Sequence, residues 1–492
     1  MNGEADSLTF VTVGGSGDLA RKKIYPALFA LYCQGLLPKT FHVFGLARTP
    51  FSDEGFRARV AERLTCRYTP GTACAERMRE FLARCRYVTG AYGARESFLD
   101  LYAAMRAAEG EREANRIFYL AIPPAVFLDV AHAIGGAGLV SCDPRRPWSR
   151  VVIEKPFGRD RESSDLLARE LAQVFTEEQT YRIDHYLGKE MVQNLLVLRF
   201  ANLVFEPIWN RNYVRCVQIA WKEDIGVEER GGYFDGTGIL RDVVQNHLLQ
   251  ILALTAMESP ERYEAGRIRD EKVKVLRAVP PVAADEVVLG QYTAAASGGG
   301  ERRRGYREEP GVAPDSVTPT FAALALQVRN RRWDGVPFLI RAGKALDGRM
   351  TEIRVQFRPV PGDIFRHLGG CPADNELIIR VQPDEAINFR IVSKTPGLGL
   401  KLAAGDLDLL YRSAFRQEIP EAYESLLLDV IRGDKTLFIR GDELEAAWDI
   451  FTPALHDFDR RRREPQPYPF GSAGPAAATA LAERYGVRWA GN

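Results

Sequence analysis

The chain has 492 residues, of which 46% are hydrophobic and 27% charged, so it is long enough for two or three ordinary globular domains with substantial cores. Its 66 basic and 65 acidic residues give a net charge of +1, so no overall field favours nucleic acid or a membrane surface as a partner. No apolar run reaches membrane-spanning length, and the acidic, polar start of the chain is unlike a signal peptide.

The cysteines are scattered along the chain, and no two of them have C-x-x-C spacing. This pattern argues against a disulfide framework and against a zinc site, and the six histidines also lack metal-ligand spacing. We therefore expect no bound metal, a reducing compartment and a cytoplasmic location. The seven cysteines are Cys33, Cys66, Cys74, Cys85, Cys142, Cys216 and Cys371.

The first predicted element is a buried strand at residues 8–13, a β-branched and aromatic run that leads directly into a glycine-rich turn. A segment with helical spacing follows at residues 24–31, and a strand, glycine turn and helix in this order are typical of dinucleotide binding. The alternative is a plain tight turn between a strand and a helix. The candidate cofactor-binding residues of the turn are Gly14, Gly15, Ser16, Gly17, Asp18 and Leu19.

The second predicted strand, Phe41–Ala47, ends at Arg48 and Thr49. A chain that binds NAD usually has an acidic residue here for the ribose hydroxyls, whereas a guanidinium and a hydroxyl suit a 2′-phosphate. This position therefore favours NADP, the alternative being a surface arginine in a loop.

The rest of the first domain, which we place at residues 1–184, alternates strands and helices. Residues 57–86 are expected to be helical and solvated, residues 115–122 and 150–153 to be strands, and the segment between these strands to contain a helix. This alternation predicts an α/β domain with a Rossmann-type, doubly wound parallel sheet, in which ligands bind at the carboxyl ends of the strands. Lys155 follows such an end, so we expect it to face nicotinamide and substrate, unless it only extends along the surface to water.

Residues 181–190 place an acid, an imidazole, a phenol and an ammonium group around one glycine: Asp184, His185, Tyr186 and Lys189 surround Gly188. An apolar segment with helical spacing follows, so a helix that begins near Gly188 would direct free N–H groups at an anion. The site suits a phosphate, and the alternative is a solvated charged loop.

The second domain, which we place at residues 185–492, is predicted to be α+β and built on a large, mostly antiparallel sheet with helices. The basis is a succession of strand-like segments without long helices between them, at residues 321–328, 337–341, 351–357 and 376–381, with an earlier one at 214–221. Residues 297–305 are a glycine- and arginine-rich insertion that we expect to be a flexible surface loop without a site.

A predicted helix at residues 239–251 carries Asp242, Asn246 and His247. A lone histidine among inward-facing residues is usually a satisfied core residue. The two other polar groups would each cost about 1–3 kcal/mol if they were buried unpaired, so a helix that lines a polar cleft is the better interpretation. Lys344, just after the strand at 337–341, either reaches this cleft or lies on the surface.

Several motifs together resemble the glucose-6-phosphate dehydrogenase family. They are Gly-Gly-Ser-Gly-Asp-Leu-Ala at 14–20, Glu-Lys-Pro-Phe-Gly at 154–158, Arg-Ile-Asp-His-Tyr-Leu-Gly-Lys-Glu at 182–190, Gly-Gly-Tyr-Phe-Asp at 231–235, Arg-Asp-Val-Val-Gln-Asn-His-Leu-Leu-Gln at 241–250 and Gly-Lys-Ala-Leu at 343–346. The resemblance extends from about Phe10 to near the C-terminus.

This resemblance implies oxidation of β-D-glucose 6-phosphate at C1 by NADP⁺, in the first step of the oxidative pentose phosphate pathway, by a homodimer or homotetramer. It makes His247 the general base and Asp184 its partner. Arg48 and Thr49, with the glycine turn and Lys155, would hold the cofactor. The implied substrate-binding residues are Lys155, His185, Tyr186, Lys189, Glu223, Asp242, Lys344 and Arg349.

Some members of the family hold a second, structural NADP⁺ on basic residues, and Met350, Thr395 and Ala473 stand at the matching positions here. We therefore expect that second site to be absent or weak. Two alternatives to the main hypothesis are a sugar dehydrogenase of the glucose–fructose oxidoreductase type and a non-catalytic NADP-binding sensor. The phosphate cluster argues against the first, and a retained acid–histidine pair argues against the second.

Overall fold

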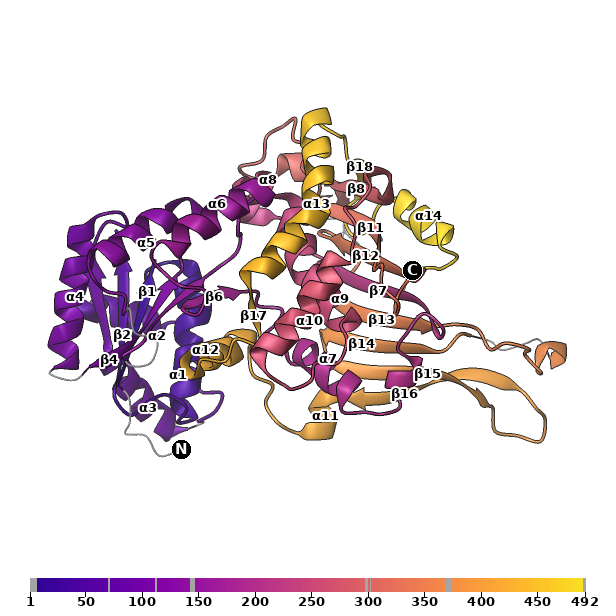
Figure 1. The fold of residues 1–492 in the computed structure, drawn as a ribbon, viewed down its shortest axis with the longest axis horizontal. Helices are drawn as coiled ribbons and strands as arrows, with labels where there is room; N and C mark the ends of the chain where they lie inside the picture. Colours follow the sequence, from indigo (N-terminus) through magenta and orange to yellow (C-terminus); the bar gives the residue numbers. More distant parts are fainter. Residues whose placement is uncertain are drawn as a thin grey trace.

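The computed structural model describes residues 7–69, 71–110, 113–141, 147–296, 300, 302–368 and 373–489. Two large sheets organise these residues, and Figure 1 shows them side by side with the long helix α13 (Gly441–Arg461) between them. The predicted fold class is confirmed: a Rossmann-type parallel sheet comes first, and a larger, mostly antiparallel sheet with helices follows.

The first sheet has the strand order of a dinucleotide-binding fold, 3-2-1-4-5-6, and these six strands are parallel. The predicted strand Phe41–Ala47 is found with the same limits. Buried parallel strands are continuous hydrophobic runs, which explains why β1, β2, β4 and β5 were recognisable. The strands are β1 (Ser7–Val13), β2 (Phe41–Ala47), β3 (Cys85–Thr89), β4 (Ala114–Leu120), β5 (Ser149–Ile153) and β6 (Thr180–Ile183).

Helices lie on both faces of this sheet (Figure 1). The segment at 57–86, predicted to be helical throughout, instead contains two helices, a connecting loop and the start of β3. The helices are α1 (Tyr25–Cys33), α2 (Asp53–Ala61), α3 (Thr72–Ala83), α4 (Arg95–Glu109), α5 (Phe127–Gly136) and α6 (Arg161–Ala172), and a π-helical turn, Ala20–Ile24, precedes α1.

A late part of the chain returns to the first sheet. The short strand β17 (Phe438–Ile439) pairs antiparallel with β6, and α12 (Ala422–Arg432) packs on α1 (Figure 1). Segments from the last fifth of the chain therefore help to build the edge at which the glycine turn and β6 end.

The second sheet has nine strands in the order 16-15-14-13-7-12-11-8-18 within the described residues. Its neighbours are antiparallel except for the pairs β7–β12 and β8–β18. The strands are β7 (Val214–Lys222), β8 (Val287–Thr293), β11 (Phe321–Gln327), β12 (Pro337–Gly343), β13 (Met350–Phe357), β14 (Glu376–Gln382), β15 (Ala386–Lys394), β16 (Leu402–Leu410) and β18 (Gln466–Pro469).

Helices α7, α9 and α10 lie over this sheet, and α13 packs on both α6 and α10, so it bridges the two halves (Figure 1). The helices of this half are α7 (Glu190–Phe200), α8 (Gly231–Asp235), the π-helix Leu240–Leu248, α9 (Leu249–Ala256), α10 (Ala265–Arg277), α11 (Tyr411–Phe415), α12, α13 and α14 (Ala476–Arg484). Short 3₁₀ turns cover Pro124–Val126, Glu206–Ile208, Glu228–Arg230, Ala284–Glu286, Tyr306–Glu308 and Arg366–Leu368.

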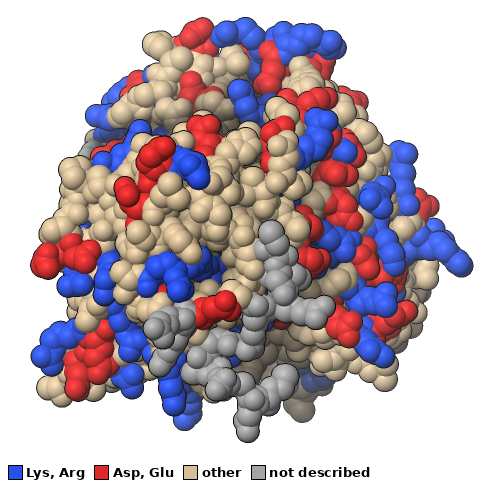
Figure 2. All heavy atoms as spheres, turned by 60° about the vertical axis from the view of Figure 1, so that its left-hand side comes forward, with Lys and Arg blue, Asp and Glu red and all other residues tan. Residues whose placement is uncertain are grey.

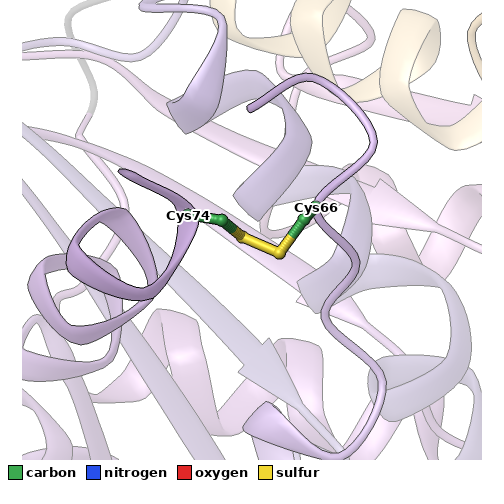
Figure 3. Close-up of a disulfide and its surroundings, with 2 residues drawn as sticks. All are labelled: Cys66 and Cys74. Atoms are coloured by element: carbon green, nitrogen blue, oxygen red, sulfur yellow. A yellow bond between two sulfur atoms is a disulfide. The ribbon is translucent and has the colours of Figure 1, made fainter. Parts of the chain in front are cut away.

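The expectation about the cysteines needs one correction. Cys66 and Cys74 form a disulfide, with Cα atoms 5.7 Å apart, that ties the first turn of α3 to the preceding loop (Figure 3). The chain turns back on itself between α2 and α3, which the sequence spacing did not indicate. Cys33, Cys85 and Cys216 are free thiols, and the other two cysteines lie outside the described residues.

The insertion at 297–305 lies partly outside the described residues, since 297–299 and 301 are not among them. On either side of these residues, β9 (Ala295–Ala296) pairs antiparallel with β10 (Arg302–Arg303). The predicted flexible loop is thus flanked by a short hairpin.

The surface agrees with the near-zero net charge. Lysine, arginine, aspartate and glutamate are interspersed over the face that includes the first half of the chain, without a large area of one sign (Figure 2). Among the described residues, no helix combines the length and the apolar character needed to cross a membrane.

Candidate active site

The glycine turn after β1 is built by close approach of backbone to backbone. Gly14 has φ +89°, and a Cβ there would lie 2.2 Å from the carbonyl oxygen of Ala121. A Cβ on Gly15 would lie 2.5 Å from the Cα of Gly45. Side chains are therefore excluded at these two positions of a turn that lies at the carboxyl ends of β1, β2 and β4, where this fold binds dinucleotides.

Arg48 and Thr49 stand where predicted, exposed at the end of β2. The Arg48 guanidinium lies 5.3 Å from the centre of the Tyr92 ring, and Tyr87 donates a hydrogen bond to the Thr49 carbonyl. A cation held at this edge, next to a glycine-rich turn, fits a dinucleotide that carries a 2′-phosphate. The donor set thus suits NADP⁺.

Lys155 leaves the end of β5 toward the second half of the chain. Its ammonium donates to the Asp242 carbonyl at 2.5 Å and to the Asp242 carboxylate at 3.0 Å. Burial would raise the pKa of Asp242, but the charge and hydrogen bond of Lys155 outweigh it and lower the pKa to about 2. The pair joins the first sheet to the π-helix.

The centre of the site is a buried acid–histidine pair. His247 Nδ1 and Asp184 Oδ1 are 2.5 Å apart, and the two residues are 2% and 1% exposed. Burial lowers the pKa of His247, so the imidazole is neutral at physiological pH, while Asp184 opposes that shift. Burial would raise the pKa of Asp184, but its hydrogen bonds with His247 and with the backbone N–H of Tyr186 lower it, so Asp184 is ionised. The pair is a carboxylate with a neutral base.

The helix predicted at 239–251 is a π-helix over Leu240–Leu248, the part that carries Asp242 and His247. Asp242 and His247 are five positions apart, which in an α-helix is about 1.4 turns and separates the side chains widely. A π-helix closes its hydrogen bonds over five residues, so both side chains share one face. The two groups influence each other's pKa, which agrees with this placement.

The phosphate-binding candidates lie directly beside the pair of Asp184 and His247. The Tyr186 ring stacks on His247 with centroids 4.5 Å apart, and the His185 ring lies edge-on to His247 at 4.7 Å. Lys189 donates to Gln382 Oε1 at 2.7 Å, and burial, with Arg349 nearby, lowers its pKa to about 8. Burial and then His247 also lower the pKa of His185.

Two further predicted residues, Glu223 and Lys344, form an ion pair. The Lys344 ammonium lies 2.5 Å from a Glu223 carboxylate oxygen. Lys344 directly follows β12, and Glu223 directly follows β7. Both residues border a cavity of about 480 Å³ that extends to the glycine turn. The cavity is lined by Asp18, Lys22, Glu223, Ile225, Gly226, Val227, Glu228, Glu229, Arg230, Tyr233, Phe234, Asp242 and Lys344.

The ligand atoms of Asp184, His185 and His247 lie within 4.8 Å of one another, a spacing that a metal ion requires. However, Asp184 and His247 are already joined by their hydrogen bond, and the charges of Lys155 and Lys189 act on His185. The surroundings therefore favour an anion.

Sequence reasoning missed several side chains of the site. Trp221 Nε1 donates a hydrogen bond to the Tyr186 hydroxyl at 2.5 Å, and Gln382 accepts one from Lys189. The Tyr423 ring lies parallel to the His185 ring. Glu154 was visible in its motif but received no role. The signal for Trp221 was its position at the end of a predicted strand, whereas nothing near Tyr423 in the sequence pointed to this cleft.

A dinucleotide fold whose strand ends meet a buried acid–histidine pair, with the charges of Lys155 and Lys189 acting on the neighbouring His185, is that of an NADP-dependent dehydrogenase with an anionic substrate. The comparisons with known proteins narrow this class. Residues 11–194 match the model for the NAD-binding domain of glucose-6-phosphate dehydrogenase, and residues 196–490 match the model for its C-terminal domain. The chain belongs to the glucose-6-phosphate dehydrogenase family.

Individual relatives agree. Glucose-6-phosphate 1-dehydrogenase 1, chloroplastic, from Arabidopsis thaliana is 53% identical over 98% of this chain and 84% of its own length. Glucose-6-phosphate 1-dehydrogenase 6, cytoplasmic, from the same plant is 48% identical over 98% and 92%. A solved glucose-6-phosphate dehydrogenase in complex with its substrate glucose-6-phosphate has a TM-score of 0.91 and 41% identity, covering all of both chains. These matches favour neither the sugar dehydrogenase of the glucose–fructose oxidoreductase type nor the non-catalytic NADP-binding sensor.

Proposed function

We propose that residues 1–184 of this glucose-6-phosphate dehydrogenase form the cofactor domain and that residues 185–492 supply the base and most of the sugar site. The enzyme oxidises D-glucose 6-phosphate at C1 with NADP⁺, giving 6-phosphoglucono-1,5-lactone and NADPH. The observation that carries this division is the buried contact between Asp184 and His247, which joins the last parallel strand to the π-helix.

His247 is the general base. Its Nδ1 is engaged by Asp184, so Nε2 remains to take the proton of the C1 hydroxyl. Burial keeps the imidazole unprotonated before the reaction, and Asp184 stabilises the imidazolium that forms. NADP⁺, when bound, accepts the hydride that leaves C1.

The remaining side chains position the sugar. His185, Tyr186 and Lys189 hold the phosphate, with Arg349 adding positive charge behind Lys189. Contacts to a phosphate far from C1 align the reacting carbon, which is where remote binding energy contributes to rate. The sugar hydroxyls are met by Glu223, Asp242 and Lys344 from the cavity wall.

The cofactor residues are those of the first sheet edge. The glycine turn, Gly14 to Leu19, approaches the pyrophosphate, and Arg48 with Thr49 holds the 2′-phosphate. Lys155 lies between cofactor and substrate, since it leaves β5 and ends on Asp242.

His247→Asn tests the assignment of the base. We expect kcat to fall by at least ~10²-fold, the lower end for loss of a general base, with little change in substrate binding. The assay follows reduced-nicotinamide absorbance with purified protein, NADP⁺ and glucose 6-phosphate. A near-normal kcat would remove His247 from this role.

We propose that the enzyme is a homodimer or homotetramer. The support is a group of exposed apolar side chains on β16, in the loop before it and at the end of α11 after it, larger than isolated surface residues require. Sedimentation equilibrium that gave only monomer at micromolar concentration would contradict the proposal. The side chains are Leu398, Leu400, Leu407, Leu409, Leu410 and Phe415.

We further propose a cytoplasmic location and an absent or weak second NADP⁺ site. Support for the location is the cytoplasmic relative, although chloroplastic relatives match at higher identity. Support for the second point is that Met350, the first residue of β13, and Thr395, directly after β15, are not basic residues. Cell fractionation tests the first, and equilibrium binding of two tight NADP⁺ per subunit would overturn the second.

A further inference from the structure

One carboxylate at the edge of the site has no part in the roles described so far. Glu154 stands between the end of β5 and Lys155, and two phenols converge on its Oε1. Tyr119 donates from 2.5 Å and Tyr423 from 3.0 Å. Burial raises the pKa of Glu154, and the two tyrosines, followed by Lys155, act against that. The carboxylate is thus held in one orientation by groups from two distant parts of the chain.

Tyr423 comes from α12, which packs against the loop that carries His185 and Lys189. Its ring lies parallel to the His185 imidazole, with an interplanar angle of 13° and centroids 6.3 Å apart. A Cβ on Gly188 would come within 2.5 Å of the Ala422 carbonyl and 2.9 Å of the Leu426 side chain. The loop therefore contains glycine here because α12 touches its backbone.

The opposite side of α12 is anchored to the first domain. Glu424 accepts a hydrogen bond from Tyr68 at 2.7 Å and lies 3.4 Å from the Arg67 guanidinium. Glu421 pairs with Lys23 at 3.0 Å. The helix is thus fixed away from the site, and its second residue, Tyr423, is directed at Glu154 and His185.

We propose that Tyr423 is a positioning residue of the dehydrogenase reaction, which acts by its hydroxyl through Glu154 on Lys155 and by its ring on His185. The hydroxyl limits the rotation of Glu154, the residue directly before Lys155, and so fixes the start of the segment that carries the ammonium to Asp242. The ring limits the tilt of the phosphate-binding imidazole. One side chain thereby links the cofactor edge of the site to its phosphate edge. This inference rests on the roles proposed above for Lys155 and His185.

The experiment compares Tyr423→Phe with Tyr68→Phe. The second variant is a matched control, because it removes the hydrogen bond that the Tyr68 phenol donates to Glu424 of the same helix. For Tyr423→Phe we expect kcat to fall roughly tenfold, with the KM for glucose 6-phosphate changed less than about twofold, because one hydrogen bond to the buried Glu154 is lost while the ring stays. Tyr423→Leu should also raise that KM roughly tenfold, since His185 loses its ring neighbour. Tyr68→Phe should leave both constants within about twofold.

A double-mutant cycle separates positioning from general stability. Glu154→Leu removes the acceptor, so adding Tyr423→Phe to it should lower kcat no further, which is the non-additivity expected of two groups that act as a unit. Glu154→Gln, which keeps an acceptor oxygen, should retain kcat within about threefold. Thermal melts of every variant identify losses that come from unfolding.

A wild-type kcat for Tyr423→Phe, an equal loss in Tyr68→Phe, or additive losses in the cycle would each overturn the proposal. The assigned roles fail differently: if Lys155→Ala and His185→Ala leave the wild-type kinetics unchanged, the residues through which Tyr423 acts have been assigned wrongly. A defect in those two variants with none in Tyr423→Phe would leave the roles standing and remove only the positioning residue.

Discussion

Asp184→Asn is the most informative single change, because it keeps the shape of the side chain and removes only its charge. Asp184 touches His247 and the backbone N–H of Tyr186, and it is 1% exposed, so solvent does not replace the lost interaction. The variant should therefore slow proton removal while the phosphate pocket keeps its contacts.

The size of the effect follows from the buried hydrogen bond between Asp184 Oδ1 and His247 Nδ1, which are 2.5 Å apart. This bond joins two charged groups only after the proton has moved to His247. A hydrogen bond to a charged group contributes about 1.5–3 kcal/mol. Its loss should therefore reduce kcat by about 10- to 150-fold, with KM for glucose 6-phosphate changed less than about threefold.

The pH profile gives an independent check with a definite sign. Burial lowers the pKa of His247, and the negative charge of Asp184 works against that lowering. Without the charge the pKa of His247 falls further, so the acidic limb of kcat/KM should move to lower pH. Asp160→Asn is the matched control, because Asp160 pairs with His456 at 3.1 Å on the surface. A variant Asp184→Asn with normal kcat, or with its limb moved to higher pH, would refute the reasoning.

Three further outcomes follow from single contacts. Lys189→Ala should raise the KM for glucose 6-phosphate and abolish discrimination against glucose. Because burial lowers the pKa of Lys189 to about 8, the wild-type KM should rise as the pH passes that value. Lys189→Arg should lack this rise. Arg48→Ala should raise the KM for NADP⁺ with little change for NAD⁺, and an equal change would contradict the 2′-phosphate role. Lys272→Ala should lower the free energy of unfolding by about 3–5 kcal/mol in denaturant titration, since its partner Glu443 at 2.7 Å is fully buried, whereas Lys274→Ala on an exposed pair should cost under about 1 kcal/mol.

The first sheet could be predicted from sequence because its strands are buried on both faces. A short, continuous hydrophobic run such as Phe41–Ala47 is typical of a strand in a covered parallel sheet, and the glycine turn marked where the first strand ends. In the second sheet, β16 was missed because its side chains are mostly exposed, so no hydrophobic pattern marks it. Strand β18 contains two prolines, which suit only an edge strand.

The site was harder to predict than the fold, because its contacts are tertiary. The partner of His247 lies 63 positions away, and a helical pattern with apolar residues at i, i+3 and i+4 does not distinguish an α-helix from a π-helix. Residue types and motifs supplied the candidates Asp184 and His247. Only the packing of the π-helix on β12 and α13 brings one nitrogen of the ring onto the carboxylate that follows β6.

The same packing explains why so short a run, residues 181–190, can serve two purposes. Strand β6 is the last parallel strand, so its end is open to the second half of the chain. Asp184 is directed toward the π-helix, whereas Lys189 is directed toward β14, where its ammonium donates a hydrogen bond to Gln382. The sites proposed for proton transfer and for phosphate binding are therefore separated by a single turn of backbone. The two functions should be separable by mutation, with Asp184→Asn acting on kcat and Lys189→Ala acting on KM.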